Sequence, residues 1–237
     1  MKIKILQWNK WFKEDPENVI DFLRKIDADI YSLQELNIES PTNEFDLIKR
    51  ELGINGVVGI TETDFGKHAN GIFSRFEIKN SFTSFIKDPA TDRQHFSDEG
   101  RIYVEAEIDL DGKILNIGTT HMSYTDAFVE NQEKKEEADK LVKLIKNKES
   151  YIFSGDLNAT EDSYTVGEVE KQLVNCGPDY SQKTWTTKPF SYNGFEENGL
   201  NWRLDYIFAT KDIQVISSKI METDYSDHLP ILAEIEV

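Results

Sequence analysis

The sequence predicts an α+β fold in which helices cover a mixed system of strands, and this many strands suits two packed sheets. Strands and helices alternate in the N-terminal part of the chain, whereas hairpins and closely spaced strands dominate the C-terminal part. Hydrophobic residues make up 38% of the 237 residues and aromatic residues 11%, which is enough to bury a substantial core. No linker rich in Gly, Ser or Pro interrupts the chain, so we expect one domain over residues 1–237.

The charge balance is acidic, with 44 Asp and Glu against 27 Lys and Arg and a net charge of −17. A field of this sign repels phosphate backbones unless basic residues or a bound cation reverse it locally. The single cysteine, Cys176, excludes an internal disulfide and suits a reducing compartment. No apolar run approaches the roughly 20 residues that cross a bilayer, and lysines interrupt the start of the chain. We therefore expect a soluble, cytoplasmic monomer without a membrane partner.

Hydrophobic periodicity and capping residues predict alternating strands and helices in the first part of the chain. Asp15 and Pro16 have the character of an N-cap and a first helical residue, and Gly53 follows the end of a second helix. The strand before that second helix is expected to end at Glu35, which puts a carboxylate at the end of a buried strand. The expected strands cover residues 3–8, 30–34 and 57–61, and the expected helices run from Asp15 past Ile26 and from about Asn43 to Leu52.

The middle of the chain contains a strong hairpin pattern. Residues 101–110 alternate strictly between apolar and polar side chains, and Asp111-Gly112 predicts the turn into a return strand that delivers His121. A long helix is expected over residues 126–148, with its interleaved lysines and glutamates forming a solvated face. His68 and His95 are interpreted as surface residues in loops.

The C-terminal part predicts mainly strands around one further helix. That helix is expected near residues 166–174. The expected strands cover residues 151–154, the neighbourhood of Thr184, and residues 204–209, 213–218 and 231–237.

Polar residues recur just past the expected strand ends, and this recurrence carries more weight than any one of them. Asp156 and Asn158 also fit a simple turn, Arg203 and Asp205 also fit a structural ion pair, and His228 also fits an ordinary loop histidine. The residues in question are Asn9, Glu35, His121, Asp156, Asn158, Asp205, Asp227 and His228.

These residue types suit phosphoryl chemistry. Glu35 can bind a hard cation such as Mg²⁺ or Mn²⁺ that neutralises a phosphate oxygen. Asp205 can orient the imidazole of His228, and Asn158 can stabilise developing charge. Histidine is the side chain best able to exchange protons near neutral pH.

Taken together, the segments resemble the endonuclease/exonuclease/phosphatase superfamily of metal-dependent phosphoesterases, which includes deoxyribonuclease I-like and AP-endonuclease-like enzymes. The resemblance spans Gln7 to Pro230 and implies a four-layered α/β/β/α sandwich of two packed mixed sheets, with the site at one end. The motifs that carry it are, in chain order, Trp8-Asn9, Leu33-Gln34-Glu35, Glu99-Gly100-Arg101, Thr120-His121, Gly155-Asp156-Leu157-Asn158, Arg203-Leu204-Asp205-Tyr206 and Ser226-Asp227-His228.

The resemblance also implies a role for each matching residue. Glu35 resembles the principal metal ligand, supported by Asn9 and Asp227, and His228 resembles a catalytic histidine paired with Asp205. Asp156 resembles the residue that activates water or protonates the leaving oxygen.

The remaining matches suggest contacts with the substrate. Asn158 resembles a transition-state donor, and His121 and Arg101 occupy positions of phosphate contacts. Asn9, Trp202 and Arg203 are further expected substrate contacts.

One departure bears on the activity. AP endonucleases usually carry an acidic residue two positions after the first Asn, where this chain has Trp11, and this argues against cleavage at AP sites. The leading expectation is a Mg²⁺- or Mn²⁺-dependent phosphodiesterase, an endo- or exonuclease acting on DNA. The alternatives are a phosphatase or phosphodiesterase of a nucleotide, sugar phosphate or lipid headgroup, and a catalytically silent binding module.

Overall fold

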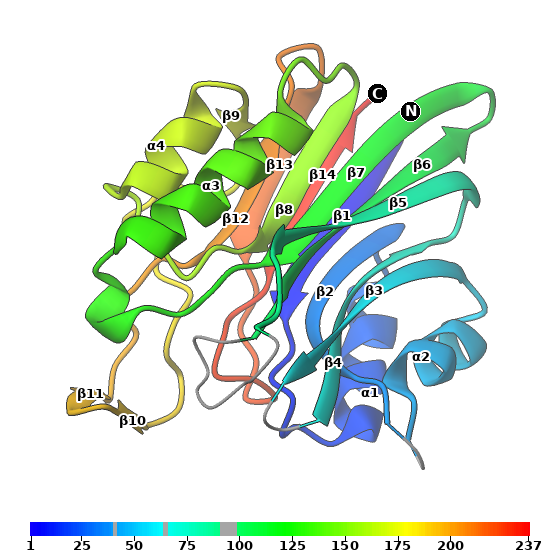
Figure 1. The fold of residues 1–237 in the computed structure, drawn as a ribbon. Coiled ribbons are helices and arrows are strands. Elements are labelled where there is room, and N and C mark those ends of the chain that lie inside the picture. Colours follow the sequence, from blue (N-terminus) through cyan, green and yellow to red (C-terminus); the bar gives the residue numbers. More distant parts are fainter. Residues whose placement is uncertain (40–41, 64–65, 91–98) are drawn as a thin grey trace.

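The computed structural model describes residues 1–39, 42–63, 66–90 and 99–237, and two mixed six-stranded sheets form the centre of this part of the chain (Figure 1). The first sheet has the order β13 (Gln214–Ile220), β14 (Ile231–Glu236), β1 (Lys2–Asn9), β2 (Ile30–Asn37), β4 (Gly66–Ser74) and β3 (Asn55–Thr63). The second has the order β5 (Glu77–Lys87), β6 (Arg101–Leu110), β7 (Lys113–His121), β8 (Tyr151–Asp156), β12 (Asp205–Ala209) and β9 (Val174–Asn175).

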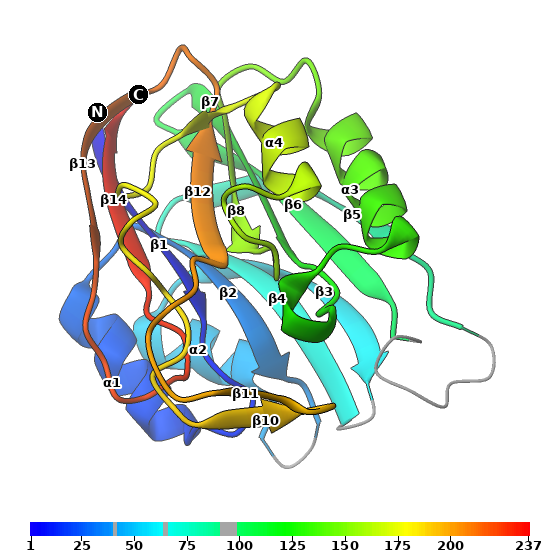
Figure 2. The same cartoon turned by 90° about the vertical axis from the view of Figure 1, so that its left-hand side faces the viewer.

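Helices cover the outer face of each sheet, which makes the four-layered sandwich that the sequence predicts (Figures 1 and 2). Helices α1 (Pro16–Ile26) and α2 (Glu44–Leu52) cover the first sheet, and α3 (Gln132–Ile145) and α4 (Tyr164–Glu170) cover the second. The hairpin of β10 (Phe190–Tyr192) and β11 (Phe195–Glu197) lies at the end of the molecule away from both termini. None of the described helices combines the length and apolar character needed to cross a bilayer.

Local signals explain where the first two helices begin and end. The Asp15 carboxylate accepts a hydrogen bond from the Glu17 N–H, and Pro16 occupies the first helical position of α1. In α2 the side chain of Asn43 caps the Asp46 N–H, and Gly53 adopts the left-handed conformation that ends the helix. Both helices therefore follow their sequence predictions closely.

The facing sides of the two sheets change from apolar to polar along the strands. On β1, Ile3 and Ile5 belong to the core between the sheets, whereas Gln7 and Asn9 on the same face are buried polar residues. Isoleucines at the start of β2 and β8 give way in the same manner to polar side chains. Because β1 and β2 run parallel, as do β7 and β8, the polar ends of these strands meet at one end of the sandwich.

The predicted elements are confirmed in most places, and the differences have physical causes. The return strand, β7, extends to His121 itself, and β2 continues past Glu35 to Asn37. Strands β4 and β5 were not predicted. Most side chains of β5 are exposed and follow no clear alternation, and β4 is buried along most of its length, so it does not alternate either. The segment expected as a helix over residues 126–148 contains a short 3-10 helix, Asp126–Phe128, before α3. No extended strand forms at Thr184, where one was predicted. The next residue, Trp185, forms isolated β-bridges with Trp202 and His228.

Three side chains that were interpreted as exposed are buried in the structure, namely His68, Lys134 and Glu137. His68 lies on β4 and is buried, so its interpretation as a surface residue is wrong. Lys134 and Glu137 of α3 are buried as well, and the solvated face of that helix excludes them. His95 lies outside the described residues.

Candidate active site

The candidate site lies where the polar ends of β1, β2, β7 and β8 meet the beginning of β12 and the segment before β14. Asn9, His121 and Asp156 are the last residues of their strands, and Asp205 is the first residue of β12. Asp205 lies opposite Asp156 in the antiparallel pairing of β12 with β8. The topology thus brings residues from six segments of the chain to one end of the sandwich.

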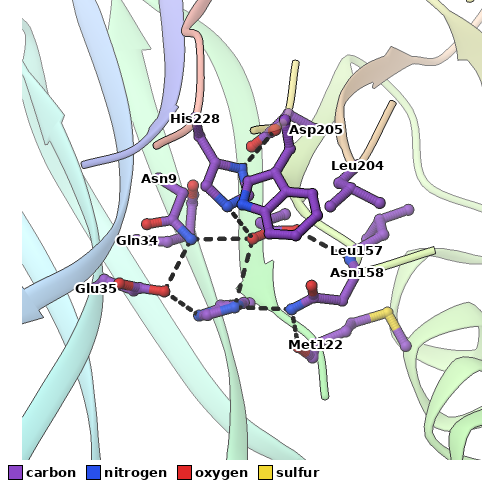
Figure 3. Close-up of polar contacts among 12 residues, drawn as sticks. Asn9, Gln34, Glu35, Met122, Leu157, Asn158, Leu204, Asp205 and His228 are labelled. Atoms are coloured by element: carbon purple, nitrogen blue, oxygen red, sulfur yellow. Dashed lines mark hydrogen bonds and ion pairs between the residues drawn. The ribbon is translucent and has the colours of Figure 1, made fainter. Parts of the chain in front are cut away.

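Glu35 reaches this site through an irregularity in β2. Its φ angle is 58°, and the pairing of β2 with β4 shifts by one residue between Leu33 and Leu36. Strict alternation would place Glu35 on the opposite face from Gln34, which points into the space between the sheets. The bulge turns the carboxylate toward Asn9 instead (Figure 3).

The imidazole of His228 is held by a buried carboxylate. Its Nδ1 atom lies 2.8 Å from Oδ2 of Asp205 (Figure 3). Gln7 Nε2 donates to the other carboxylate oxygen at 3.1 Å. Burial by itself would lower the pKa of His228, but the charges of Asp205 and Asp156 and the hydrogen bond to Asp205 raise it well above its ordinary value. Asp205 and Asp156 therefore favour the protonated form of His228.

Asp156 lies between the histidines and the Asn9 amide. Its Oδ2 accepts a hydrogen bond from Asn9 Nδ2 at 2.9 Å and lies 3.6 Å from His228 Nε2. Burial raises the pKa of Asp156 to about 7, with the Asp205 charge adding to the rise and His228 and Asn9 opposing it. A carboxyl group with this pKa can both accept and release a proton near neutral pH.

The Asn9 amide joins Asp156 to Glu35. Its Nδ2 donates to Glu35 Oε1 at 3.0 Å, and the Phe12 N–H donates to Glu35 Oε2 at 3.0 Å. Burial alone would raise the pKa of Glu35, but His121, the Asn9 amide and the Phe12 N–H lower it to about 2. Glu35 is accordingly a carboxylate throughout the physiological pH range.

His121 and Asn158 form the wall of the site opposite Asn9. The Asn158 Nδ2 lies 3.0 Å from His121 Nε2 and donates to the Met122 carbonyl at 3.0 Å (Figure 3). Burial lowers the pKa of His121 to about 3 against the opposing charge of Glu35, so its imidazole is neutral at pH 7. The pKa values of the two histidines are therefore shifted in opposite directions, because His228 has the hydrogen-bonded carboxylate of Asp205 behind it.

Asp227 lies beside this centre and has its own partners. The Trp185 indole N–H donates to Asp227 Oδ2 at 3.2 Å, and burial raises the pKa of this carboxyl. The neighbouring Ser226 hydroxyl donates to the Asn9 carbonyl at 2.7 Å and accepts from the His228 N–H at 3.0 Å. Ser226 thus ties the loop before β14 to the end of β1.

The expected substrate contacts differ in their positions. Arg101 is buried next to Glu99, which it contacts at 3.0 Å, and its charge contributes to the low pKa of His121. Trp202 is half-buried, packs against Phe128 and donates its indole N–H to Glu197. It pairs with Trp185, which in turn pairs with His228.

The structure places Arg203 differently from the expected substrate contact. Its side chain is fully buried, and its guanidinium donates to the backbone carbonyls of Gln182 and Asp205. It also stacks on the rings of Tyr180 and Tyr206. Arg203 therefore supports the strand that carries Asp205 and does not reach a substrate, and the alternative of an ion pair with the Asp205 side chain does not occur either.

The donor atoms suit a hard divalent cation. Glu35, Asp227 and the side-chain oxygen of Asn9 are oxygen ligands, which Mg²⁺ and Mn²⁺ prefer. A second grouping, Asp156, Asp205 and His228, has ligand atoms within 4.8 Å of one another. Asp205 and His228 already satisfy each other by a hydrogen bond, whereas Glu35 is anionic and partly exposed.

Several supporting residues were missed at the level of sequence. Gln7 and Gln34 form a buried amide pair at 2.8 Å behind Asp205, and the Trp8 indole N–H donates to the His228 carbonyl at 3.1 Å. A glutamine at an apolar position of a buried strand was the available signal, since a buried amide needs a polar partner. No comparable signal indicated Lys134, whose surroundings in the sequence are those of an exposed helix.

Comparison with known proteins supplies the family. A profile of the endonuclease/exonuclease/phosphatase family matches residues 6–228, which is nearly the whole chain. The chain belongs to this family. No curated protein sequence matches it.

Solved structures of the family share the fold at low sequence identity. A family protein from Bacteroides vulgatus is 19% identical with a TM-score of 0.74, covering 100% of this chain and 99% of that one. A mannosyl-6-phosphatase from Bacteroides thetaiotaomicron is 16% identical with a TM-score of 0.68, covering 99% and 100%. TDP2 from D. rerio, complexed with a single-strand DNA product, is 18% identical with a TM-score of 0.73, covering 100% and 99%. These similarities establish the sandwich fold of the family for this chain.

Proposed function

We propose that this chain is a Mg²⁺- or Mn²⁺-dependent phosphodiester hydrolase acting on DNA, as an endo- or exonuclease. The observation that carries the proposal is the paired arrangement of Asp205 with His228 next to Asp156. It combines an imidazolium with a carboxyl group whose pKa is near 7. Such a pair can stabilise a phosphorane-like charge and move a proton in one site.

The reaction follows from these protonation states. Water attacks phosphorus in line with the leaving oxygen, so that a new P–O bond forms while the ester P–O bond breaks. Asp156 takes the proton from the attacking water or supplies one to the leaving oxygen, and its pKa of about 7 suits either direction. His228, held by Asp205, donates to a phosphate oxygen and balances its growing charge.

The remaining groups position the phosphate. Asn158 and His121 line the wall opposite His228, where they can contact the phosphate, and Arg101 adds a positive charge behind them. Glu35, Asn9 and Asp227 would hold the divalent cation, which neutralises charge on a nonbridging phosphate oxygen when bound. The cation also offsets part of the net charge of −17, which otherwise repels DNA.

Two observations support DNA over a compact substrate. One family relative of the same fold is D. rerio TDP2 complexed with a single-strand DNA product. An aromatic group lies beside His228, in which the buried Trp185 ring is 6.2 Å from the imidazole and its neighbours Trp202 and Phe190 are partly exposed. Partly exposed aromatic rings are suited to stacking on nucleobases.

The alternative is a phosphatase of a sugar phosphate or nucleotide. The acidic charge of the chain and a family relative that is a mannosyl-6-phosphatase favour this reading. The two readings differ in the ester that is cleaved, because a monoesterase must accept a dianionic phosphate and a nuclease a diester.

Hydrolysis of bis-p-nitrophenyl phosphate and p-nitrophenyl phosphate, each with Mg²⁺, Mn²⁺ or EDTA, separates the readings. We expect metal-dependent turnover that favours the diester and that disappears in His228→Ala. A labelled single-stranded oligonucleotide then distinguishes endo- from exo-cleavage by product length. Preference for the monoester would support the phosphatase, and no metal-dependent turnover of any of the three substrates would contradict the proposed hydrolase.

A further inference from the structure

Lys134 of α3 is a buried lysine beneath the candidate site. Its side chain is about 1% exposed, and its ammonium group donates to the backbone carbonyls of Ser123 at 2.5 Å and Leu157 at 2.6 Å. Ser123 lies two residues after His121 in the segment that follows β7. Leu157 lies between Asp156 and Asn158 in the segment that follows β8. One side chain from the outer helical layer therefore joins the two segments that carry these site residues.

A second residue of α3 completes the connection. Glu137 is also buried, and its Oε1 accepts a hydrogen bond from the Ser123 N–H at 3.0 Å. The N–H and the carbonyl of Ser123 are thus both hydrogen-bonded to side chains of α3, the N–H to Glu137 and the carbonyl to Lys134. The Asn158 amide in turn donates to the Met122 carbonyl, next to Ser123, and lies 3.0 Å from His121 Nε2. The contacts form a closed path from α3 through both segments to the pair of Asn158 and His121.

The burial of this ammonium calls for a specific compensation. An unpaired charge inside a protein is costly, and a helical lysine normally extends into solvent. Among the described residues no carboxylate lies within ion-pair distance of the Lys134 Nζ, so the two carbonyls are its direct partners, and the more distant charges of Glu137 and Asp156 also favour the ammonium form. Both carbonyls belong to segments of the site, and Lys134 itself is too deeply buried to contact a substrate.

We propose that Lys134 is a positioning residue of the site, which sets the spacing of Asn158 and His121 through the carbonyls of Leu157 and Ser123. The inference rests on the proposed hydrolase function. Groups that form a catalytic site must be held within roughly 0.5 Å of their productive geometry. Without the ammonium group, the two carbonyls lose their common partner and the two segments are free to separate.

The first test compares Lys134→Met with Lys140→Met. Both changes remove one positive charge from α3, but Lys140 is exposed and forms a surface ion pair with Asp88. For bis-p-nitrophenyl phosphate with Mg²⁺ we expect kcat of Lys134→Met to fall by about 10- to 100-fold, since displacements near 1 Å reach this size. KM should change little, because Lys134 does not touch the substrate. Lys140→Met should retain the wild-type constants, and a folded Lys134→Met with wild-type kcat would overturn the inference.

A double-mutant cycle with Asn158→Ala distinguishes positioning from general support of the fold. If Lys134 acts through Asn158, the loss caused by Lys134→Met should be much smaller when Asn158 is already absent. Losses that multiply in the double variant would contradict the path through Asn158. Should Lys134→Met not fold, Lys134→Gln, which keeps one donor group, replaces it in the cycle.

A measurement that needs no activity separates this inference from the proposed function. The imidazole resonances of His121 and the side-chain amide resonances of Asn158 should shift in Lys134→Met and remain in place in Lys140→Met. Wild-type protein that hydrolyses no phosphate ester would refute the proposed function, even if these shifts occur. Unchanged resonances in folded Lys134→Met would refute the positioning role, even if wild-type protein is an active hydrolase.

Discussion

His228 Nδ1 and Asp205 Oδ2 lie 2.8 Å apart, and both side chains are buried. The second oxygen of Asp205 is bound by Gln7, so the carboxylate cannot rotate without losing a hydrogen bond. The other ring nitrogen of His228 then faces Asp156, at 3.6 Å from Oδ2. This relationship fixes the direction in which the imidazolium can donate a proton.

Asp205→Asn should therefore impair turnover without a change of substrate affinity. The amide removes the charge that keeps His228 protonated, and we expect kcat to fall by about 10²- to 10⁴-fold, the usual size of an acid–base contribution. Steady-state kinetics on bis-p-nitrophenyl phosphate give the measurement. Asp224→Asn, at an exposed position of the segment that carries His228, is the control and should behave as wild type. An Asp205→Asn enzyme with wild-type kcat would remove His228 and Asp205 from the chemistry.

Glu35 should govern cation binding. We expect Mg²⁺ to raise the melting temperature of the wild-type protein, since a ligand at 100 times its Kd stabilises the folded state by about 2.7 kcal/mol. Glu35→Gln keeps the shape of the side chain but loses its charge, and the Mg²⁺-dependent rise should largely disappear. Glu39→Gln changes an exposed glutamate nearby and should keep the full rise. Equal responses of the two variants would place the cation elsewhere, with the group of Asp156, Asp205 and His228 as the next candidate.

Two glycines should respond to alanine in opposite directions. A Cβ atom at Gly155 would collide with the carbonyl oxygen of Thr120 on the paired strand β7, so Gly155→Ala should lower the free energy of unfolding by about 1–3 kcal/mol. At Gly167 in α4 a Cβ atom meets nothing within 4 Å, and Gly167→Ala should raise it by about 0.5–1 kcal/mol. Urea unfolding of both variants gives the values. A tolerated Gly155→Ala would mean that β7 and β8 can separate near the site.

Lys134 should make the free energy of unfolding depend on pH in the alkaline range. Burial lowers its pKa in the folded protein to about 8 against the opposing charges of Glu137 and Asp156, from an ordinary value of 10.5. Between these two values the unfolded chain binds the proton that the folded chain has released, so the free energy of unfolding rises with pH. The increase in the free energy of unfolding from this group is at most about 3 kcal/mol and is complete above pH 10.5.

Urea titrations at pH 7.5, 9 and 10 compare wild-type protein with Lys134→Met. The wild-type protein should gain stability relative to the variant across this range. Parallel pH dependences would show that Lys134 keeps an ordinary pKa in the folded state.

Local sequence patterns were sufficient for much of the fold. The strict alternation of residues 101–110 predicted β6 with its observed bounds, and Asp15, Pro16 and Gly53 predicted the ends of α1 and α2. These signals act within a few residues, through backbone hydrogen bonds and through side chains that share one face. Strands β4 and β5 gave no such signal, because β5 is largely exposed and β4 is buried along most of its length.

The sequence by itself determined the family, the sandwich fold and the set of polar residues at strand ends, because each of these depends on residue type and local order. Only the tertiary structure decided which of these side chains meet. Asn9 contacts Glu35 and Asp156, which lie 26 and 147 residues away, and Lys134 and Arg203 turn inward where local patterns indicate other positions. Such contacts depend on strand register, on the bulge at Glu35 and on the packing of one sheet against the other. Periodicity reports the face on which a residue lies, but not the partner that the opposite layer brings to it.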